Sequence, residues 1–272
     1  GRPATSEETP NQVLLPELPY RWRSAAAFLD RGLLAAGTAA VAILVVRAAV
    51  VGKVPDDLAV YKGAIDGWLS GDGLYSFARP NGDGFTYPPA AALALVWVHW
   101  LEGGALAAVW VCLTGLVAAV CATALHRRAG ASAGLAFVLL LGSAAGHSNI
   151  RFGQVSIFVF ALCLVDVCLV PRRYRGLLTG LAAALKLTPI LFLVYFLCRR
   201  RWRNLANATA ALLASMAAGA VFLPTDTLRY LRSGLWSVST VSHWDSLGNQ
   251  SLRGVMARLG FSDPWIATAI GA

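Results

Sequence analysis

Two adjacent carboxylates, Asp56 and Asp57, follow directly after an apolar stretch, 33–51, that is long enough to cross a membrane. A carboxylate held at the membrane surface can accept the proton of a hydroxyl group that attacks a lipid-linked substrate. General bases of this kind typically contribute roughly 10²- to 10⁴-fold in rate. Asp57 is therefore the candidate catalytic residue, with Asp56 as the alternative. A competing interpretation is that Asp57 is a solvated side chain that complements the positive end of a helix.

The residues after Asp57 have the spacing of an amphipathic helix. Apolar side chains recur on one face, whereas Lys62 and Asp66 take the opposite face. Gly71 offers a stop for this helix. The pattern predicts a surface helix over 57–70, with Asp57 in its first turn and Tyr61 one turn further on. Tyr61 is thereby a candidate for the substrate pocket.

Three cations lie in or near apolar segments. Arg47 is close to the outer end of the first segment, Arg151 lies at the outer end of another, and Lys186 interrupts a third. Cations at membrane depth are costly and usually have a specific partner, which we expect to be a lipid phosphate. Gln154, three residues after Arg151, adds an amide donor on the same face. Arg47 has a second interpretation, since a long side chain near a helix end can extend to the interface.

Aromatic and amide side chains in two external segments suit a carbohydrate, which packs against rings and forms hydrogen bonds through its hydroxyls. The rigid segment 85–89 contains Tyr87 and two prolines. It is either one wall of a sugar or lipid pocket or only a turn that starts a helix. The later segment is either a sugar-binding loop or an ordinary polar loop. Its candidate pocket residues are His243, Trp244, Asn249 and Gln250.

The sequence predicts neither a metal site nor a cofactor. No cluster of Asp, Glu and His recurs at close spacing. Asp56 and Asp57 would make a poor chelate, because neighbouring side chains on a helix point roughly 100° apart. The five cysteines lie inside apolar stretches without a paired-ligand spacing.

The composition indicates a polytopic membrane protein. Hydrophobic residues make up 57% of the chain and charged residues 14%, and the mean hydropathy is +0.60. The net charge of +9 comes from arginines gathered between apolar segments. This arrangement is typical of cytoplasmic loops rather than of a nucleic-acid-binding surface. The partners that we expect are therefore membrane lipids, with no nucleic acid.

Arginine placement predicts the topology. Residues 131–146 are expected to cross the membrane as one segment. Residues 177–198, flanked by arginines on both sides, are expected to form two short helices that break near Lys186, because Pro189 interrupts the helix. The expected organisation is a cytoplasmic tail over 1–32, a transmembrane module over 33–223, an external loop over 224–262 and the start of a further helix over 263–272 of a truncated chain. Within the module, an external loop over 52–104 is expected to carry interfacial helices at about 57–70 and 88–101.

Six short motifs occur in one order along the chain: Asp57–Tyr61, Gly73–Tyr75, Phe85–Pro89, Phe152–Val155, Ala184–Pro189 and Asn249–Ser251. Together they resemble glycosyltransferase family 87, the polyprenol-phosphate-mannose-dependent α-mannosyltransferases of mycobacteria and their relatives. The resemblance covers most of residues 30–255. The family pattern often has a bulkier residue where this chain has Ala90.

The resemblance implies an all-α, polytopic integral membrane protein with a C-type glycosyltransferase-like helix bundle and interfacial helices in the first external loop. It places the protein in the plasma membrane, with its active site on the external face. It implies that Asp57 is the base of an inverting mannosyl transfer from polyprenyl-phosphate-mannose, with Arg47, Arg151 or Lys186 stabilising the charge on the leaving donor phosphate. The implied acceptor is a mannosylated lipid, a phosphatidylinositol mannoside or a lipomannan or lipoarabinomannan chain, extended through an α-1,2 linkage.

Two other functions stay open at this point. The first is transfer of another polyprenyl-linked sugar, such as arabinofuranose. The second is a transporter or lipid flippase, which would also have intramembrane charges and broken helices. Two features argue against transport: the sequence shows no matching pair of broken segments, and its first external loop is longer than transport requires.

Overall fold

The computed structural model describes residues 20–234, 255–256 and 258–259. Within these residues the chain is helical and contains one isolated β-bridge, between Ala78 and Gly84, and no strand. The expected all-α membrane fold is confirmed. The elements are α1 (Tyr20–Val51), α2 (Asp56–Leu69), α3 (Pro89–Leu95), the 3₁₀ helix η1 (Val96–Trp100), α4 (Gly103–Ala129), α5 (Ala133–Gly142), α6 (Ala144–Phe152), α7 (Ser156–Cys168), α8 (Leu177–Leu185), α9 (Ile190–Cys198), α10 (Trp202–Phe222), α11 (Pro224–Arg229) and the π-helix η2 (Tyr230–Gly234).

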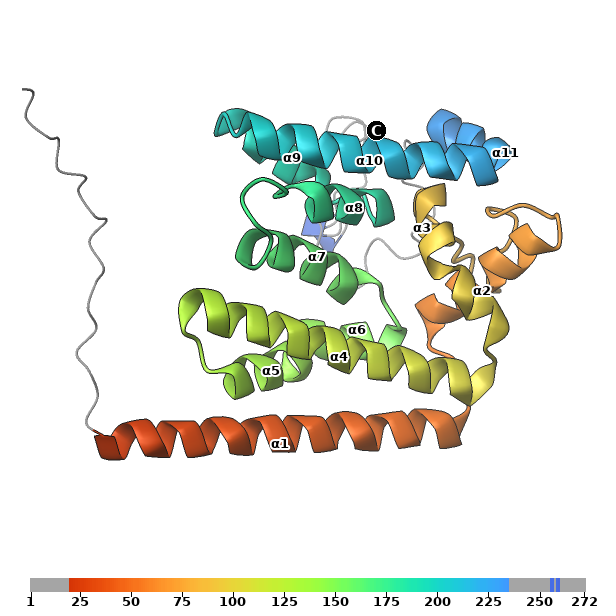
Figure 1. Cartoon of the computed structure of the whole chain (residues 1–272). Coiled ribbons are helices and arrows are strands. Elements are labelled where there is room, and N and C mark those ends of the chain that lie inside the picture. The colour runs from red at the N-terminus through yellow and green to blue at the C-terminus, as the bar shows by residue number, and fades with distance from the viewer. Residues whose placement is uncertain (1–19, 235–254, 257, 260–272) are drawn as a thin grey trace, which may run out of the picture.

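The long helices form a stack that begins with α1 and ends with α10 (Figure 1). In this stack α1 packs on α4 and α5, α4 packs on α7, α7 on α8, and α8 on α10. The short helices α2 and α3 lie together at one end, where α1 ends and α4 begins (Figure 1). That end of the stack therefore holds Asp57.

Three of the described helices are long and apolar enough to cross a membrane: α1 over Ser24–Val51, α4 and α10. A fourth crossing results if α5 and α6 are counted as one bent span. The apolar helix α7 is shorter than these. Much of the outward surface of α1 and α9 consists of exposed apolar side chains, as expected for helices that face lipid.

The first helix begins earlier than the predicted span at residue 33, so part of the predicted tail is helical. Asp30, a charged residue inside this extension, has hydrogen-bond partners at the start of α5. The Asp30 carboxylate accepts hydrogen bonds from the Ser132 hydroxyl and, at 2.7 Å, from the Gly134 amide. Asp30 thereby pairs with hydrogen-bond donors at the start of α5, where the first backbone amides have no partner within the helix.

The segment expected to cross the membrane over 131–146 is bent. Helices α5 and α6 meet at Ser143 with an angle of 58°. The Ser143 hydroxyl caps α6 by accepting a hydrogen bond from the Gly146 amide at 3.1 Å. Gly146 packs so closely on the backbone of Leu140 that a side chain would clash there. The bend directs α6 and its last residues toward α2.

Helices α8 and α9 are separated by a break over residues 186–189. Helix α8 lies against α10, where Gly176 and Gly180 approach the backbone of Asn204 and Ala208. Gly176 also has a φ of +102°, which favours glycine. This packing fixes the end of α8, so Lys186 lies at a defined position beside α7.

Asp166, at the end of α7, is a buried carboxylate that organises the turn into α8. It accepts hydrogen bonds from the Gly176 amide at 2.7 Å, the Leu178 amide at 3.2 Å and the Thr179 hydroxyl at 2.9 Å. Only 1% of the residue is exposed. Three donors would therefore be left buried without this acceptor.

We expect Asp166→Ala to lower the free energy of unfolding by about 3 kcal/mol or more, because buried donors that lose a charged acceptor keep their desolvation cost. The measurement is the midpoint of thermal unfolding of the detergent-purified full-length protein. Asp72→Ala is the matched control, since Asp72 is exposed. An equal and small change in both variants would contradict this role of Asp166.

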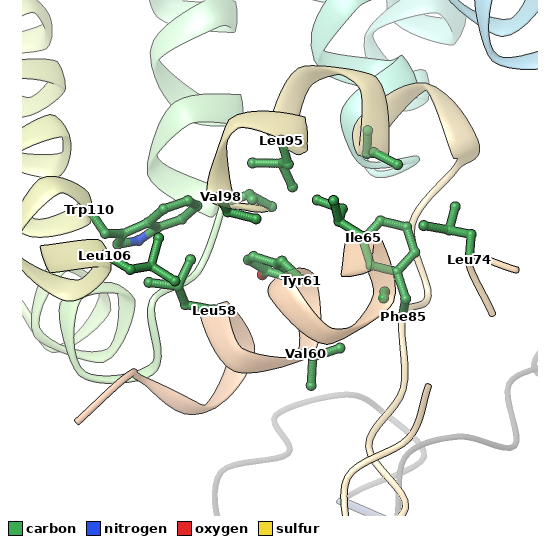
Figure 2. Close-up of a cluster of buried hydrophobic side chains, with 14 of the residues drawn as sticks. Leu58, Val60, Tyr61, Ile65, Leu74, Phe85, Leu95, Val98, Leu106 and Trp110 are labelled. Carbon is green, nitrogen blue, oxygen red and sulfur yellow. The ribbon is translucent and has the colours of Figure 1, made fainter. Parts of the chain in front are cut away.

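The main hydrophobic core lies among α2, α3, η1 and the start of α4 (Figure 2). Tyr61 is 1% exposed and Trp110 also 1% exposed, and their ring centroids lie 6.0 Å apart. The segment predicted as an interfacial helix over 88–101 is α3 followed by η1, and much of it is buried in this core. The segment between α1 and α4 is thus a packed unit that can hold side chains in fixed positions.

Candidate active site

Asp57 is the second residue of α2, two positions after Pro55 at the N-cap. The corner between α6 and α7 packs against this turn through Gly153, whose φ is +71°. A Cβ atom on Gly153 would lie 2.8 Å from Leu58 Cβ and 2.9 Å from Pro55 Cβ, so only glycine fits. This close approach brings the side-chain amide of Gln154 within hydrogen-bonding reach of the Asp57 carboxylate.

Two tyrosines lie beside this carboxylate. The hydroxyls of Tyr61 and Tyr87 are 3.2 Å apart and share a hydrogen bond. The Tyr75 hydroxyl donates to the Tyr87 carbonyl at 2.8 Å, which holds the segment before α3 in place. Burial raises the pKa of both Tyr61 and Tyr87, and the nearby charge of Asp57 acts in the same direction. Both phenols therefore stay neutral and can donate or accept hydrogen bonds.

Lys186 completes the cluster from the break between α8 and α9. Its ammonium group donates to the Ser156 hydroxyl at 3.0 Å and lies 5.8 Å from the centroid of the Tyr87 ring. It is close enough to Asp57 to interact electrostatically. Among the described contacts, however, the two groups form no ion pair. Space between a carboxylate and a cation is what a transferred sugar and its leaving group require.

A groove of about 410 Å³ leads away from Lys186 along α7 and α9. Ser156, Lys186 and Thr188 supply polar groups, and the rest of the lining is mostly apolar: Val159, Phe160, Cys163, Leu164, Val167, Pro189 and Phe192. A groove with a cation among apolar walls suits the phosphate and the hydrocarbon chain of a lipid.

Asp57 has an environment that suits a base. Burial raises the pKa of its carboxyl group above the ordinary value, and the hydrogen bond from Gln154 acts in the opposite direction. Asp83 and Asp56 also raise this pKa, whereas Lys186 lowers it. The carboxylate is therefore a stronger proton acceptor than a solvated aspartate.

Asp56 has different surroundings, although it is the neighbour of Asp57. It accepts a hydrogen bond from Arg79 at 2.9 Å and forms an ion pair with it. It also lines a cavity of about 760 Å³ between α1, α4, α5 and α6, together with Arg47 and Arg151. The structure thus places Lys186 with Asp57, but Arg47 and Arg151 on a separate cavity beside Asp56.

The other predicted pocket residues, His243, Trp244, Asn249 and Gln250, lie outside the described residues. Two residues that the sequence analysis missed are Ser156, which holds Lys186, and Arg79, which engages Asp56. Ser156 follows Gln154 by two residues, so the motif around Gly153 extends further than expected. No sequence pattern around Arg79 indicates its contact with Asp56, because the turn that brings the two residues together depends on the packing of the whole loop.

Metal ligands are not gathered in the described part of the chain. No group of three or more His, Cys, Asp or Glu side chains there could hold a metal ion. The cations of the site are the side chains of lysine and arginine.

The site combines a half-buried carboxylate, a cation and a mostly apolar groove, and comparison with known proteins identifies the family of the chain. The chain matches glycosyltransferase family 87 over residues 85–272. It belongs to glycosyltransferase family 87. The matched region contains Tyr87, Gln154 and Lys186, whereas Asp57 precedes it. The resemblance noted from the sequence motifs is confirmed.

Curated members of family 87 align with most of the chain. A polyprenol-phosphate-mannose-dependent α-(1-2)-phosphatidylinositol mannoside mannosyltransferase of Mycolicibacterium smegmatis is 34% identical over 248 residues, which cover 78% of this chain and 54% of the relative. The protein of the same description from Mycobacterium tuberculosis is 33% identical over 253 residues, covering 79% and 57%. A phosphatidylinositol pentamannoside mannosyltransferase of M. smegmatis is 32% identical over 216 residues, covering 75% and 52%.

The chain thus spans about half the length of the curated family 87 relatives that it matches. No solved structure matches it.

Proposed function

We propose that this protein transfers mannose from polyprenyl-phosphate-mannose to a mannosylated phosphatidylinositol or a related lipoglycan. The observation that carries the proposal is the cluster in which the Asp57 carboxylate lies near the ammonium group of Lys186, and Lys186 lines an apolar groove. The family and the names of its relatives support the donor, the acceptor class and an α-(1-2) linkage.

Asp57 accepts the proton of an acceptor hydroxyl in this proposal. The hydroxyl oxygen attacks the anomeric carbon of the donor, the bond from that carbon to the phosphate oxygen breaks, and polyprenyl phosphate leaves. This single displacement inverts the anomeric configuration. Gln154 positions the Asp57 carboxylate through its hydrogen bond. The proton on Asp57 is afterwards released to water.

Lys186 stabilises the charge that develops on the leaving phosphate. Ser156 orients its ammonium group, and the groove along α7 receives the first part of the prenyl chain. The phenols of Tyr61 and Tyr87 offer hydrogen-bond partners for sugar hydroxyls at the same place. His243, Trp244, Asn249 and Gln250 remain proposed carbohydrate contacts of the later loop.

The site would operate at the external face of the plasma membrane. The support is the acidic balance of the loop that contains α2 and the arginine clusters at 172–173 and 199–201, which favour the cytoplasm. A polyprenyl-linked donor also requires a site that opens to lipid, which the groove beside Lys186 provides.

The test is an assay of the purified full-length protein with radiolabelled polyprenyl-phosphate-mannose and mannosylated phosphatidylinositol. Label should move into the acceptor through an α-(1-2) linkage. A parallel reaction with polyprenyl-phosphate-arabinofuranose tests the other sugar class. Transfer of arabinose but not of mannose would overturn the donor assignment. No transfer of either sugar, with movement of the intact lipid across the bilayer, would favour a transporter.

The activity is expected to be independent of divalent metal ions, because lysine supplies the charge at the phosphate. Excess EDTA should leave the rate of the wild-type enzyme unchanged, and addition of Mg²⁺ or Mn²⁺ should not raise it. Loss of activity with EDTA that Mg²⁺ restores would contradict this mechanism and make the adjacent aspartates candidate ligands.

The dependence of the rate on pH should report the Asp57 carboxyl group. Because the reaction needs the ionised base, kcat/KM should fall as the pH decreases through the raised pKa of Asp57. Gln154 lowers this pKa by a hydrogen bond, so Gln154→Leu should move the acid limb to higher pH. The measurement is the pH profile of both enzymes in one buffer series, and a shift to lower pH would contradict the assignment.

A further inference from the structure

The cavity beside Asp56 contains more positive than negative charge. Arg47, Lys53 and Arg151 line it together with His147, and its acidic side chain is Asp56. That carboxylate is already paired with Arg79 at 2.9 Å. Two guanidinium groups and an ammonium group are thus available to an anion, and guanidinium groups suit phosphate because they can donate two parallel hydrogen bonds.

The interior of the same cavity is apolar. It lies between α1, α4 and α5, and its walls include Val41, Leu44, Val111 and Val138. These helices include two of the candidate membrane spans. A cavity of about 760 Å³ with a cationic mouth and an apolar interior among such helices fits a lipid with an anionic head group.

The start of α2 and the corner after α6 form one wall of this cavity, and the same two segments carry Asp57 and Gln154. At the start of α2, Asp56 lines the cavity while Asp57 bonds to Gln154. At the corner after α6, Arg151 lines the cavity while Gln154 reaches Asp57. Gly153 joins the two segments, because it packs directly on α2. A molecule held in the cavity therefore lies next to the base without occupying the position of the donor.

We propose that this cavity binds the lipid acceptor through its phosphodiester, on Arg47 and Arg151, while the donor phosphate lies on Lys186. This inference rests on the proposed function. The charge of the cavity matches the single negative charge of a phosphodiester, and its apolar interior matches the acyl chains. The glycan of the acceptor then extends across the wall formed by the start of α2 and the corner after α6, and presents its hydroxyl to Asp57.

The donor lipid and the acceptor lipid are therefore bound at the same time. The three cations that the sequence analysis assigned to one phosphate then bind two phosphates. The donor needs a cation near the reacting carbon, which Lys186 provides through its position close to Asp57. Arg47 and Arg151 lie apart from Asp57 and Lys186, and they bind the head group of the acceptor. The prediction is that their loss changes acceptor binding and leaves donor binding unchanged.

The first experiment measures lipid retention and does not depend on turnover. Full-length protein is purified in detergent, incubated with phosphatidylinositol and examined by native mass spectrometry. The double variant R47Q/R151Q should retain at least about tenfold less lipid than the wild type, since each lost hydrogen bond involves two charged groups. The control variant R127Q/R128Q changes exposed arginines at the end of α4 and should retain as much as the wild type.

The second experiment measures kinetics with both substrates. In R47Q/R151Q the KM for the mannosylated lipid should rise at least about tenfold, with the KM for polyprenyl-phosphate-mannose unchanged. R47K/R151K keeps the charges and should recover part of the loss. A rise in the donor KM instead of the acceptor KM would overturn the assignment, because the cavity would then hold the donor.

Competition between lipids distinguishes an acceptor site from a site for bulk phospholipid. Phosphatidylglycerol carries the same charge but no glycan, and it should displace bound mannosylated phosphatidylinositol poorly because it lacks the mannose that reaches Asp57. Equal displacement would show a general anionic-lipid site and contradict the proposal.

If the protein transfers no mannose but R47Q/R151Q still loses lipid selectively, the proposed activity fails while the lipid site stands. Equal retention by the wild type and R47Q/R151Q overturns the lipid site alone.

Discussion

Asp57→Asn should reduce turnover at least about a hundredfold while the protein still folds. The substitution keeps the shape of the side chain but removes its capacity to accept a proton, and general bases contribute roughly 10²- to 10⁴-fold. Half-buried Asp57 lies at the surface of the core, so an amide is tolerated there. The measurement is kcat with polyprenyl-phosphate-mannose, together with the thermal unfolding midpoint of each protein.

Asp56→Asn is the matched control for this prediction, because the two residues are adjacent on α2. Asp56 is paired with Arg79 and lines the other cavity. Asp56→Asn should therefore reduce turnover less than Asp57→Asn does. Activity of Asp57→Asn within about threefold of the wild type would rule out its role as the base, since general-base loss must cost more. If only Asp56→Asn loses turnover, the two carboxylates exchange roles.

Lys186→Met should lower kcat by roughly 10²- to 10³-fold, the usual cost of removing one group that stabilises charge in the transition state. Methionine keeps the length of the side chain and the packing against Tyr87 but not the charge. Turnover, rather than binding of the acceptor, should account for most of the loss. The measurement is a single-turnover reaction with saturating donor.

Lys186→Arg is the control, since arginine keeps a positive charge near Ser156. It should retain clearly more activity than Lys186→Met. Ser156→Ala should have a smaller effect than Lys186→Met, because Ser156 orients the ammonium group rather than contacting the phosphate. Equal activity of Lys186→Met and the wild type would show that the phosphate lies elsewhere.

The sequence indicated the fold class and the centre of the candidate site. Alternating apolar and basic segments predicted an all-α membrane protein, since the bilayer permits few other arrangements. Helical spacing placed Asp57 and Tyr61 one turn apart on α2. Proline near Lys186 predicted the break between α8 and α9, because proline cannot continue a helix. These features depend on local patterns.

Features that depend on tertiary contacts were not predictable. The bend at Ser143 results from a side-chain cap and from the packing of Gly146 on Leu140, and hydropathy does not report either. The extension of α1 contains Asp30, whose partners lie about a hundred residues further along the chain. Spacing also cannot show that Lys186 lies apart from Arg47 and Arg151, because helix packing decides this.

The most direct test of the proposed active site is a cryo-electron microscopy structure of full-length Asp57→Asn with polyprenyl-phosphate-mannose bound. The slow variant should hold the intact donor. We predict that its phosphate contacts Lys186, that the prenyl chain enters the groove along α7, and that the mannose lies between Lys186 and the carboxamide at position 57. Donor density with the phosphate on Arg47 and Arg151, or with the mannose remote from position 57, would contradict the assignment of this site.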